Sequence, residues 1–288
     1  MKLRSLIVLI FCTALPLFAV KIPSQVKKSV AFIFMKDSTN RLQPTGTGFF
    51  ILLNAQQNGD TANFGYLVTT KGSVRTMNGK YYDSVYIRIN RKDGYSDTLI
   101  IPLTLNGVPR YFVHPDSAVD LAMVPAYPDA GRYDFLFTPV NMIATVDFLR
   151  KEMISEGDEF FSTGMFSSHI GLFKNIPSVR FMRMVQLSDE KYPVGNTYSE
   201  LYVIDSPFST GSNGSPLYYY VPATKDSAGS AKFLLAGVVS GHFPRSLFDR
   251  TGLTSVVPGY RLMEMMSLPA VAAERDKEFQ RLQQGKKK

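Results

Sequence analysis

Hydrophobic residues recur along most of the chain in short runs that are separated by Gly, Pro, Asn and Asp. Short runs of this kind, bounded by turn-forming residues, are typical of β-strands, and Asn58-Gly59-Asp60 favours a hairpin turn. The pattern predicts a first set of strands over Ser29–Lys36, Thr47–Leu53, Phe64–Thr70, Tyr81–Asn90, Asp97–Leu103, Tyr111–His114 and Leu121–Val124. It predicts a second set over Glu159–Gly164, Val179–Leu187, Leu201–Ile204, Leu217–Val221, Phe233–Ser240 and Leu253–Val257.

Many short strands with few helical stretches indicate an all-β protein of the barrel or sandwich class. The two strand sets lie in residues 20–126 and 158–260. We interpret the Pro-containing segment 127–157 between them as a linker, and a surface excursion within one domain is the alternative. A helix-like piece is expected at Thr145–Lys151. A short helix is expected to start at Pro258 and to end at Pro269. The C-terminal segment, 261–288, is expected to hold most of this helix, a second amphipathic helix and a basic tail.

The first 19 residues predict a secretory signal peptide. Lys2 and Arg4 precede a run of apolar residues, and a small residue, Ala19, offers a cleavage site. Cys12, the single cysteine of the chain, lies in this segment, so the mature chain is expected to form no intramolecular disulfide. We therefore expect a periplasmic or secreted protein with no integral membrane segment after cleavage; an uncleaved anchor or a buried N-terminal segment is the alternative.

Composition and charge narrow the classes of partner. The chain has 288 residues, of which 45% are hydrophobic and 19% charged, which is typical of a globular protein with a substantial core. The net charge of +8 is concentrated at the ends, in Lys2, Arg4 and the final Lys286-Lys287-Lys288. We therefore expect no nucleic-acid partner. The composition does not predict an oligomeric state.

Candidate chemistry centres on Gly211-Ser212-Asn213-Gly214-Ser215-Pro216, between two apolar runs. Glycines tolerate backbone conformations that turn successive N–H groups towards one point, and such a group of donors stabilises an oxyanion. The loop resembles the nucleophile loop of trypsin-like serine peptidases, where Gly-Asn/Asp-Ser-Gly-Gly/Ser-Pro carries the catalytic serine. The resemblance implies an oxyanion loop of Gly211, Asn213 and Gly214.

Further segments resemble this family in order and spacing over about residues 29–260. These are the Gly-Thr-Gly-Phe strand at Gly46–Phe49, the Leu-Val-Thr strand at Leu67–Thr69, the aspartate segment at Asp120–Ala122, the start of a second barrel at Gly157–Gly164, and a pocket-lining strand at Gly237–Gly241. The family has the chymotrypsin fold, so the resemblance implies two packed six-stranded antiparallel β-barrels. It also implies that Ser240 and Gly241 contact the bound chain.

The catalytic triad of the family is incomplete in this sequence. Asp120 matches the aspartate, but Gly72 stands at the histidine position and Asn213 at the serine position. Peptidase chemistry needs a hydroxyl nucleophile and an imidazole that removes its proton, and the aspartate only orients that imidazole. The resemblance therefore implies a pseudoprotease. For Asp120, capping a turn or accepting backbone N–H bonds is favoured over a role in proton chemistry.

Three functional hypotheses follow. The first is an inactive homologue that binds protein or peptide in the groove between the barrels. The second is an active hydrolase in which Ser212, Ser215 or Ser73 replaces the nucleophile and Lys71 or a histidine the base; Lys71 is expected to be solvated and protonated. The third is a surface role through the C-terminal helix and lysine tail. The histidines His114, His169 and His242 have no metal-ligand spacing, and no cofactor or metal is expected.

Overall fold

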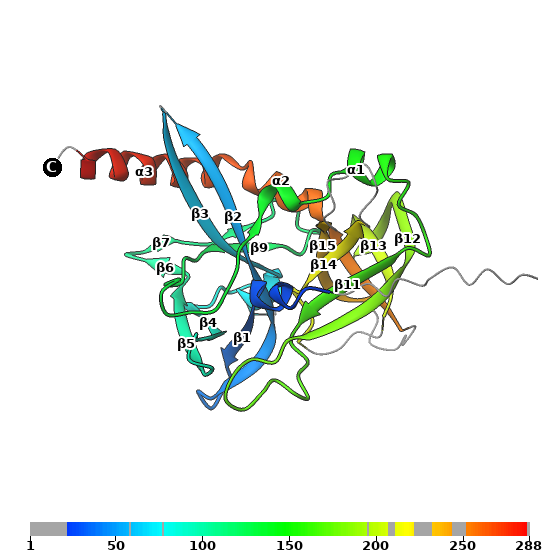
Figure 1. The fold of residues 1–288 in the computed structure, drawn as a ribbon, viewed down its shortest axis with the longest axis horizontal. Helices are drawn as coiled ribbons and strands as arrows, with labels where there is room; N and C mark the ends of the chain where they lie inside the picture. Colours follow the sequence, from blue (N-terminus) through cyan, green and yellow to red (C-terminus); the bar gives the residue numbers. More distant parts are fainter. Residues whose placement is uncertain are drawn as a thin grey trace, which may run out of the picture.

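The computed structural model describes residues 22–57, 59–76, 78–194, 196–206, 211–221, 232–243 and 252–286. The predicted signal peptide lies outside the described residues. Two β units stand side by side, the first formed by the blue and cyan strands and the second by the green to orange strands (Figure 1). The short strands β6 (Thr104–Leu105) and β7 (Val108–Pro109) have two residues each and form a separate two-stranded sheet that belongs to neither unit.

The first unit is a sheet with the strand order β5-β4-β1-β2-β3-β9-β8, and all these pairs are antiparallel. Alternation explains its register: in β4, Val85, Ile87 and Ile89 are buried while the residues between them are more exposed. Its strands are β1 (Val30–Lys36), β2 (Leu42–Gln57), β3 (Asp60–Thr69), β4 (Ser84–Asn90), β5 (Ser96–Pro102), β8 (Phe112–Val113) and β9 (Ala122–Pro125). A further short strand, β10 (Thr138–Pro139), pairs with β2 in parallel.

The second unit is a closed barrel with the strand order β11-β12-β13-β16-β15-β14. Its strands are β11 (Glu159–Gly164), β12 (Ser178–Val194), β13 (Thr197–Asp205), β14 (Pro216–Val221), β15 (Lys232–Phe243) and β16 (Leu253–Pro258). In β12, Met182 and Met184 point into the barrel and Phe181 and Arg183 point outwards, as the two-residue period of a strand requires. Closure leaves this unit without an unpaired edge strand.

The all-β fold predicted from the sequence is confirmed, and every predicted strand overlaps an observed one. The domain boundaries stay a prediction. Segment 127–157, which we interpret as a linker, contacts both units: Phe135 and Phe137 pack edge-on against Phe50 in the first unit, and the Ala144 N–H donates to Leu235 O in the second. It also carries the 3-10 turn η3 (Val140–Met142) and the helix α1 (Val146–Lys151), capped by the Thr145 hydroxyl.

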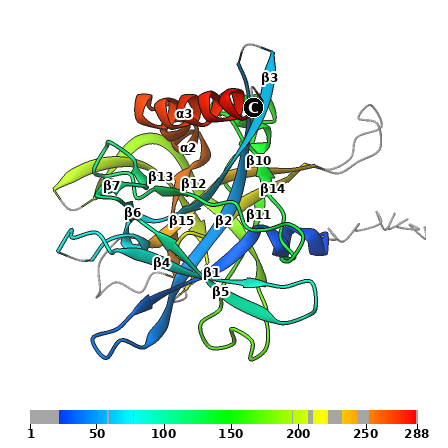
Figure 2. The same cartoon turned by 90° about the vertical axis from the view of Figure 1, so that its left-hand side faces the viewer.

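Two helices follow the last strand. The helix α2 (Gly259–Met266) matches the predicted one, and Pro269 not only follows it but opens the longer helix α3 (Pro269–Lys286). Both views place α3 beside the hairpin of β2 and β3 (Figure 1, Figure 2). There the rings of Phe64 and Phe279 meet edge to face at 5.5 Å. No helix in the described part of the chain combines the length and apolarity needed to cross a membrane.

The core divides into an interior for each unit and a shared layer between the units. Phe50 and Leu67 belong to the interior of the first unit, and Met182 and Leu217 to that of the second. Because side chains alternate along β2, the neighbours of Phe50 turn the other way and join the shared layer with residues of the second unit and of α2 and α3. The shared layer fixes how the two units sit against each other.

The connection from β11 to β12, residues 165–177, crosses to the first unit and is bound there, as its position beside β5 shows (Figure 2). Asn175 donates from Nδ2 to Arg88 O at 2.6 Å and from its backbone N–H to Asn90 Oδ1 at 2.7 Å. The Arg88 guanidinium donates to the carbonyl oxygens of Gly171 and Leu172, both at 2.9 Å. We call residues 165–177 the strap, because they tie the second barrel to the first sheet.

Candidate functional site

The glycine loop, residues 211–215, is held in the bent form expected from its sequence. Gly211 and Gly214 have φ values of 97° and 81°, in the left-handed region where a side chain is strained. The Gly214 N–H donates to Val239 O at 2.8 Å, and the Val239 N–H donates to Ser215 O at 2.9 Å. A Cβ at Gly214 would overlap the carbonyl oxygen of Thr47 in β2, so the loop lies tightly against the first unit.

Thr47 is the residue that fastens this loop. It is completely buried, and its backbone N–H donates to Asn213 O at 2.8 Å. Its hydroxyl donates to Gly211 O at 2.8 Å and accepts the Met165 N–H at 2.9 Å, so one side chain satisfies two backbone groups of the second unit. Its carbonyl oxygen accepts the Thr69 hydroxyl at 2.9 Å. One residue of the first unit thereby positions the start and the middle of the glycine loop.

Asn213, at the predicted nucleophile position, lies beside the strand that was expected to contact a bound chain. A Cβ at Gly241 would lie 3.9 Å from Asn213 Oδ1. This Oδ1 is buried and has no hydrogen-bond partner in the described structure. An amide offers neither a lone pair of useful basicity on nitrogen nor an ionisable hydroxyl, so Asn213 cannot attack a carbonyl as serine does.

Asp120 and Gly72 lie together, as their alignment with the family implies. The 3-10 turn η2 (Lys71–Ser73) presents the Lys71 N–H to Asp120 Oδ1 at 2.9 Å. Gly72 is exposed, and no described atom lies within 4 Å of the position that its Cβ would occupy. Both residues line a hollow of about 580 Å³ that Arg75 and Tyr82 also border. A histidine side chain at position 72 therefore has space beside the carboxylate.

Lys71 corrects an expectation from the sequence. It was expected to be solvated, but the residue is only 4% exposed, and its Nζ donates to Asp116 O at 2.9 Å. Burial lowers the pKa of its amine, and Arg75 acts in the same direction. The ammonium group donates to the backbone carbonyls of residues 116 and 117, and a group so engaged does not serve as a base for a serine in the loop.

Two of the three serines considered as replacement nucleophiles, Ser73 and Ser215, are buried. Ser73 is buried, with its Oγ 3.0 Å from Thr69 Oγ1 and 3.3 Å from Thr70 Oγ1. Ser215 Oγ is buried and packs against Gly164, where a Cβ would overlap it. Ser212 is half-buried at the inner side of the loop. None of the hydrogen bonds of Ser73 involves a titratable base, which nucleophilic activation requires.

The predicted contact residues Ser240 and Gly241 lie at an irregular point of β15. The register of β15 against β16 shifts between Val239 and Gly241, as in a β-bulge, and Gly241 has a φ of 143°. Ser240 is buried and its Oγ lies 3.1 Å from Ser255 Oγ, while the Ser255 hydroxyl donates to Gly241 O. The bulge therefore brings Gly241 close to Asn213, while the Ser240 side chain is held by Ser255 of β16.

The three histidines differ in burial. His114 is buried; its Nδ1 accepts the Asp116 N–H, so Nε2 carries the proton and donates to Glu264 of α2 at 3.1 Å. Burial lowers the pKa of His114. His169 and His242 are exposed. Within the described ranges no cluster of three His, Cys, Asp or Glu residues could hold a metal ion.

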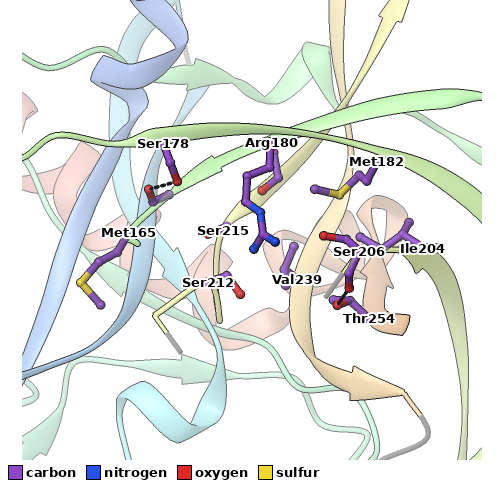
Figure 3. Close-up of a pocket in the computed structure, with 12 residues that line it drawn as sticks. Met165, Ser178, Arg180, Met182, Ile204, Ser206, Ser212, Ser215, Val239 and Thr254 are labelled. Carbon is purple, nitrogen blue, oxygen red and sulfur yellow. Dashed lines mark hydrogen bonds between the residues drawn. The ribbon is translucent and has the colours of Figure 1, made fainter. Parts of the chain in front are cut away.

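Sequence reasoning missed two residues of the site. Thr47 was part of a quoted motif, but nothing in the sequence indicates that its hydroxyl bridges the two units. Arg180 was placed in a predicted strand without a role, yet its guanidinium reaches a small pocket beside Ser212 (Figure 3). The sequence did contain a signal for Arg180. Arg180, Met182 and Met184 are spaced by two residues, so they lie on the same face of β12, and this is the face that points into the barrel.

No protein-family model and no curated protein sequence matches the chain. Among solved structures, the protease domain of MamO from Magnetospirillum magneticum, in its apo form, is 17% identical, with 84% of this chain and 97% of that one covered and a TM-score of 0.50. The Rv3671c protease in an inactive form is 15% identical, with 84% of this chain and 88% of that one covered and a TM-score of 0.44. A serine-to-alanine mutant of Rv3671c from M. tuberculosis H37Rv is 16% identical, with 86% of this chain and 88% of that one covered and a TM-score of 0.46. The similarity to the MamO domain shows that this chain has the two-unit, all-β fold of trypsin-like protease domains.

Proposed function

We propose that the protein is an exported, catalytically inactive homologue of trypsin-like serine peptidases that binds protein or peptide in the groove between its two β units. This proposal rests on a difference between the groups that the site keeps and the groups that it lacks. The glycine loop, the aspartate and the neighbouring strand lie together, while an exposed glycine and an asparagine stand where base and nucleophile are needed.

The chemistry supports inactivity. Asp120 accepts a backbone N–H from Lys71, so part of its hydrogen-bonding capacity serves the turn that carries Gly72. A carboxylate without an imidazole orients nothing, and Asn213 supplies no hydroxyl. In subtilisin, the loss of the serine or the histidine alone lowers turnover about a million-fold. With both groups replaced, we expect no hydrolysis above background.

Binding of an extended chain does not need the lost groups. An extended peptide binds by adding main-chain hydrogen bonds to an exposed strand segment, and side-chain pockets then supply specificity. Gly241 lies next to Asn213 at the bulge of β15, and we place the centre of the proposed groove there. Thr47 holds the glycine loop in place without any help from a nucleophile, which preserves the shape of the groove.

The test is labelling with a fluorophosphonate probe, which reacts with activated serines. The natural protein is compared with Gly72→His/Asn213→Ser, which restores both missing groups, and with Gly72→His/Asn213→Ala as the matched control without a nucleophile. We expect labelling of the serine double variant alone, because the space at Gly72 accepts an imidazole beside Asp120. Labelling of the natural protein would refute inactivity and favour the alternative, a hydrolase with a displaced nucleophile such as Ser212.

Export is tested separately. After expression of the full chain in a Gram-negative host, we expect the protein in the periplasmic fraction or the medium, with a mature N-terminus at Val20. Recovery of the full-length chain from the cytoplasm would refute the proposed cleavage after Ala19.

A further inference from the structure

The strap presents two large apolar side chains to solvent at one turn. Leu172 is 85% exposed and Phe173 is 66% exposed, and we call these two residues the tip. The exposed Tyr95, in the turn from β4 to β5, meets the Phe173 ring edge to face at 6.3 Å. Both views place the strap at the end of the molecule opposite to α3 (Figure 1, Figure 2). A contiguous group of exposed apolar side chains commonly marks a surface that binds a partner.

The backbone of the tip is held in place by the first sheet. The carbonyl oxygens of residues 171–173 are all paired, the first two with the Arg88 guanidinium and the third with the Ser96 hydroxyl at 3.0 Å. Gly171 has a φ of 88°, and a Cβ there would overlap Lys174 O, so the tight turn requires glycine. Carbonyl groups that are already paired within the protein lose no hydrogen bond when they enter an apolar medium, so such a medium can receive the tip at little polar cost.

The charged groups around the tip leave an excess of positive charge. The strap itself contains no acidic residue. The nearby acidic side chains each form an ion pair with a cation, in the pairs Arg91–Asp93, Arg91–Asp97, Arg132–Asp97 and Lys28–Asp134. Three exposed lysines belong to no ion pair among the described residues, and these are Lys27, Lys92 and Lys174. The surface around the tip therefore attracts anions.

Two of these lysines border a hollow beside the tip. The hollow has a volume of about 280 Å³ and is lined by Lys27 of η1 (Ser24–Ser29), by Lys174 and by the neighbouring Ile176 of the strap. Lys28 and the Ser24 residue also line it. Lysine ammonium groups bind phosphate as point charges, so the hollow suits a phosphate group next to an apolar anchor.

We propose that the tip inserts into the surface of an anionic lipid bilayer, with Lys27, Lys92 and Lys174 at the level of the lipid phosphates. A protein partner is disfavoured because the tip and Tyr95 offer three apolar side chains, far fewer than the roughly 20–30 residues that each side of a stable protein interface contributes. A bilayer needs no matching shape, and a small apolar anchor together with basic side chains is sufficient for reversible membrane contact. This proposal does not depend on the peptide groove.

The first measurement is co-sedimentation of the mature chain with vesicles of phosphatidylcholine alone, or of equal parts phosphatidylcholine and phosphatidylglycerol. We expect binding to the mixed vesicles and an affinity lower by about tenfold or more in Leu172→Ser/Phe173→Ser, because two apolar anchors are lost. The matched control is Met153→Ser/Tyr198→Ser, which changes side chains that are 83% and 63% exposed in the second unit. We expect this control to bind as the natural protein does.

The contribution of charge is tested with Lys92→Gln/Lys174→Gln. A basic residue near an anionic membrane contributes about fivefold to affinity, so two substitutions are expected to weaken binding to the mixed vesicles by about 25-fold. The control is Lys151→Gln/Lys191→Gln, which removes the same charge from two exposed positions at α1 and in β12. We expect this control to change the affinity by less than about twofold, because those lysines lie more than a Debye length from the membrane.

Insertion of the tip is followed by fluorescence. The chain contains no tryptophan, so Phe173→Trp introduces a single reporter at the tip. On addition of mixed vesicles, we expect its emission to shift to shorter wavelength and brominated acyl chains to quench it. Tyr198→Trp is the control at a site of similar exposure, 63% against 66%, and we expect neither a shift nor quenching there.

The outcomes distinguish a membrane from other partners. Equal affinity of the natural protein and Leu172→Ser/Phe173→Ser for mixed vesicles, or unshifted emission of Phe173→Trp on them, would overturn the proposal. If the natural protein ignored vesicles and the same double variant turned a dimer into a monomer in analytical ultracentrifugation, the tip would contact a second copy instead. Neither result bears on the proposed function, because fluorophosphonate labelling of Gly72→His/Asn213→Ser is expected to be the same with and without the tip.

Discussion

Replacement of Thr47 by valine tests the claim that one hydroxyl fixes the glycine loop. Valine has the same shape and keeps the β-branched side chain that suits a strand, so Thr47→Val removes the hydrogen bonds of Oγ1 and little else. Gly211 O and the Met165 N–H then lose their partner. A buried polar group left unsatisfied costs about 1–3 kcal/mol, so the free energy of unfolding is expected to fall by about 2–6 kcal/mol.

The assay is equilibrium unfolding in guanidinium chloride, with Thr47→Ser as the control. Serine keeps the hydroxyl and loses one methyl group, which costs about 1 kcal/mol. Hydrogen exchange at the Met165 amide provides a local readout, and we expect faster exchange in Thr47→Val than in Thr47→Ser. If Thr47→Val were as stable as Thr47→Ser and its Met165 amide equally protected, the fastening role of the hydroxyl would be refuted.

The remaining predictions concern other parts of the site and the strap. Gly214→Ala is expected to lose about 3 kcal/mol or more of unfolding free energy, because its φ is positive and a Cβ would overlap Thr47, while Gly72→Ala, in open space, should change it by less than about 0.5 kcal/mol; equal losses would contradict this. Burial lowers the pKa of His114 in the folded state, so the unfolded chain takes up the proton first; stability should be constant above about pH 6.5 and fall as the pH drops below it, and His114→Gln should flatten this slope in urea titrations. An unchanged slope would show that other groups cause the acid sensitivity. Asn175→Ala removes the hydrogen bond from the buried Asn175 side chain to Arg88 O, so we expect limited proteolysis within the strap to accelerate at least fivefold relative to an alanine variant of the exposed neighbour Lys174.

The strand pattern was readable from the sequence because turn residues bound each apolar run and side chains alternate along it. In β4 the buried Val85, Ile87 and Ile89 show this directly. Short elements were missed: β6, β7 and β10 have two residues each, too few for any period. The role of Pro269 was half predicted, since a proline that cannot continue one helix also suits the first turn of the next.

The site was predictable as an assembly but not in its details. The resemblance placed Asp120 next to the turn of Gly72, and the structure has them in contact through the Lys71 N–H. The burial of Lys71 was not predicted, because it depends on carbonyl groups of residues 116 and 117, far away in the sequence. The burial of Ser240 against Ser255 was not predicted either, because it occurs at a bulge, and a bulge shifts the alternation that a sequence pattern assumes.

Because α3 packs against the hairpin of β2 and β3, the first sheet can complete its packing only after the C-terminal helix has been synthesised. Phe279 covers Phe64, and Val271 belongs to the shared core layer, so the first sheet lacks part of its cover until the last residues are made. At about 5–20 residues per second, a ribosome needs about 10–40 s to deliver that cover. Removal of residues 270–288 would therefore expose Phe64 and part of the shared layer. The behaviour of such a truncated variant reports on folding rather than on binding partners of the C-terminal segment.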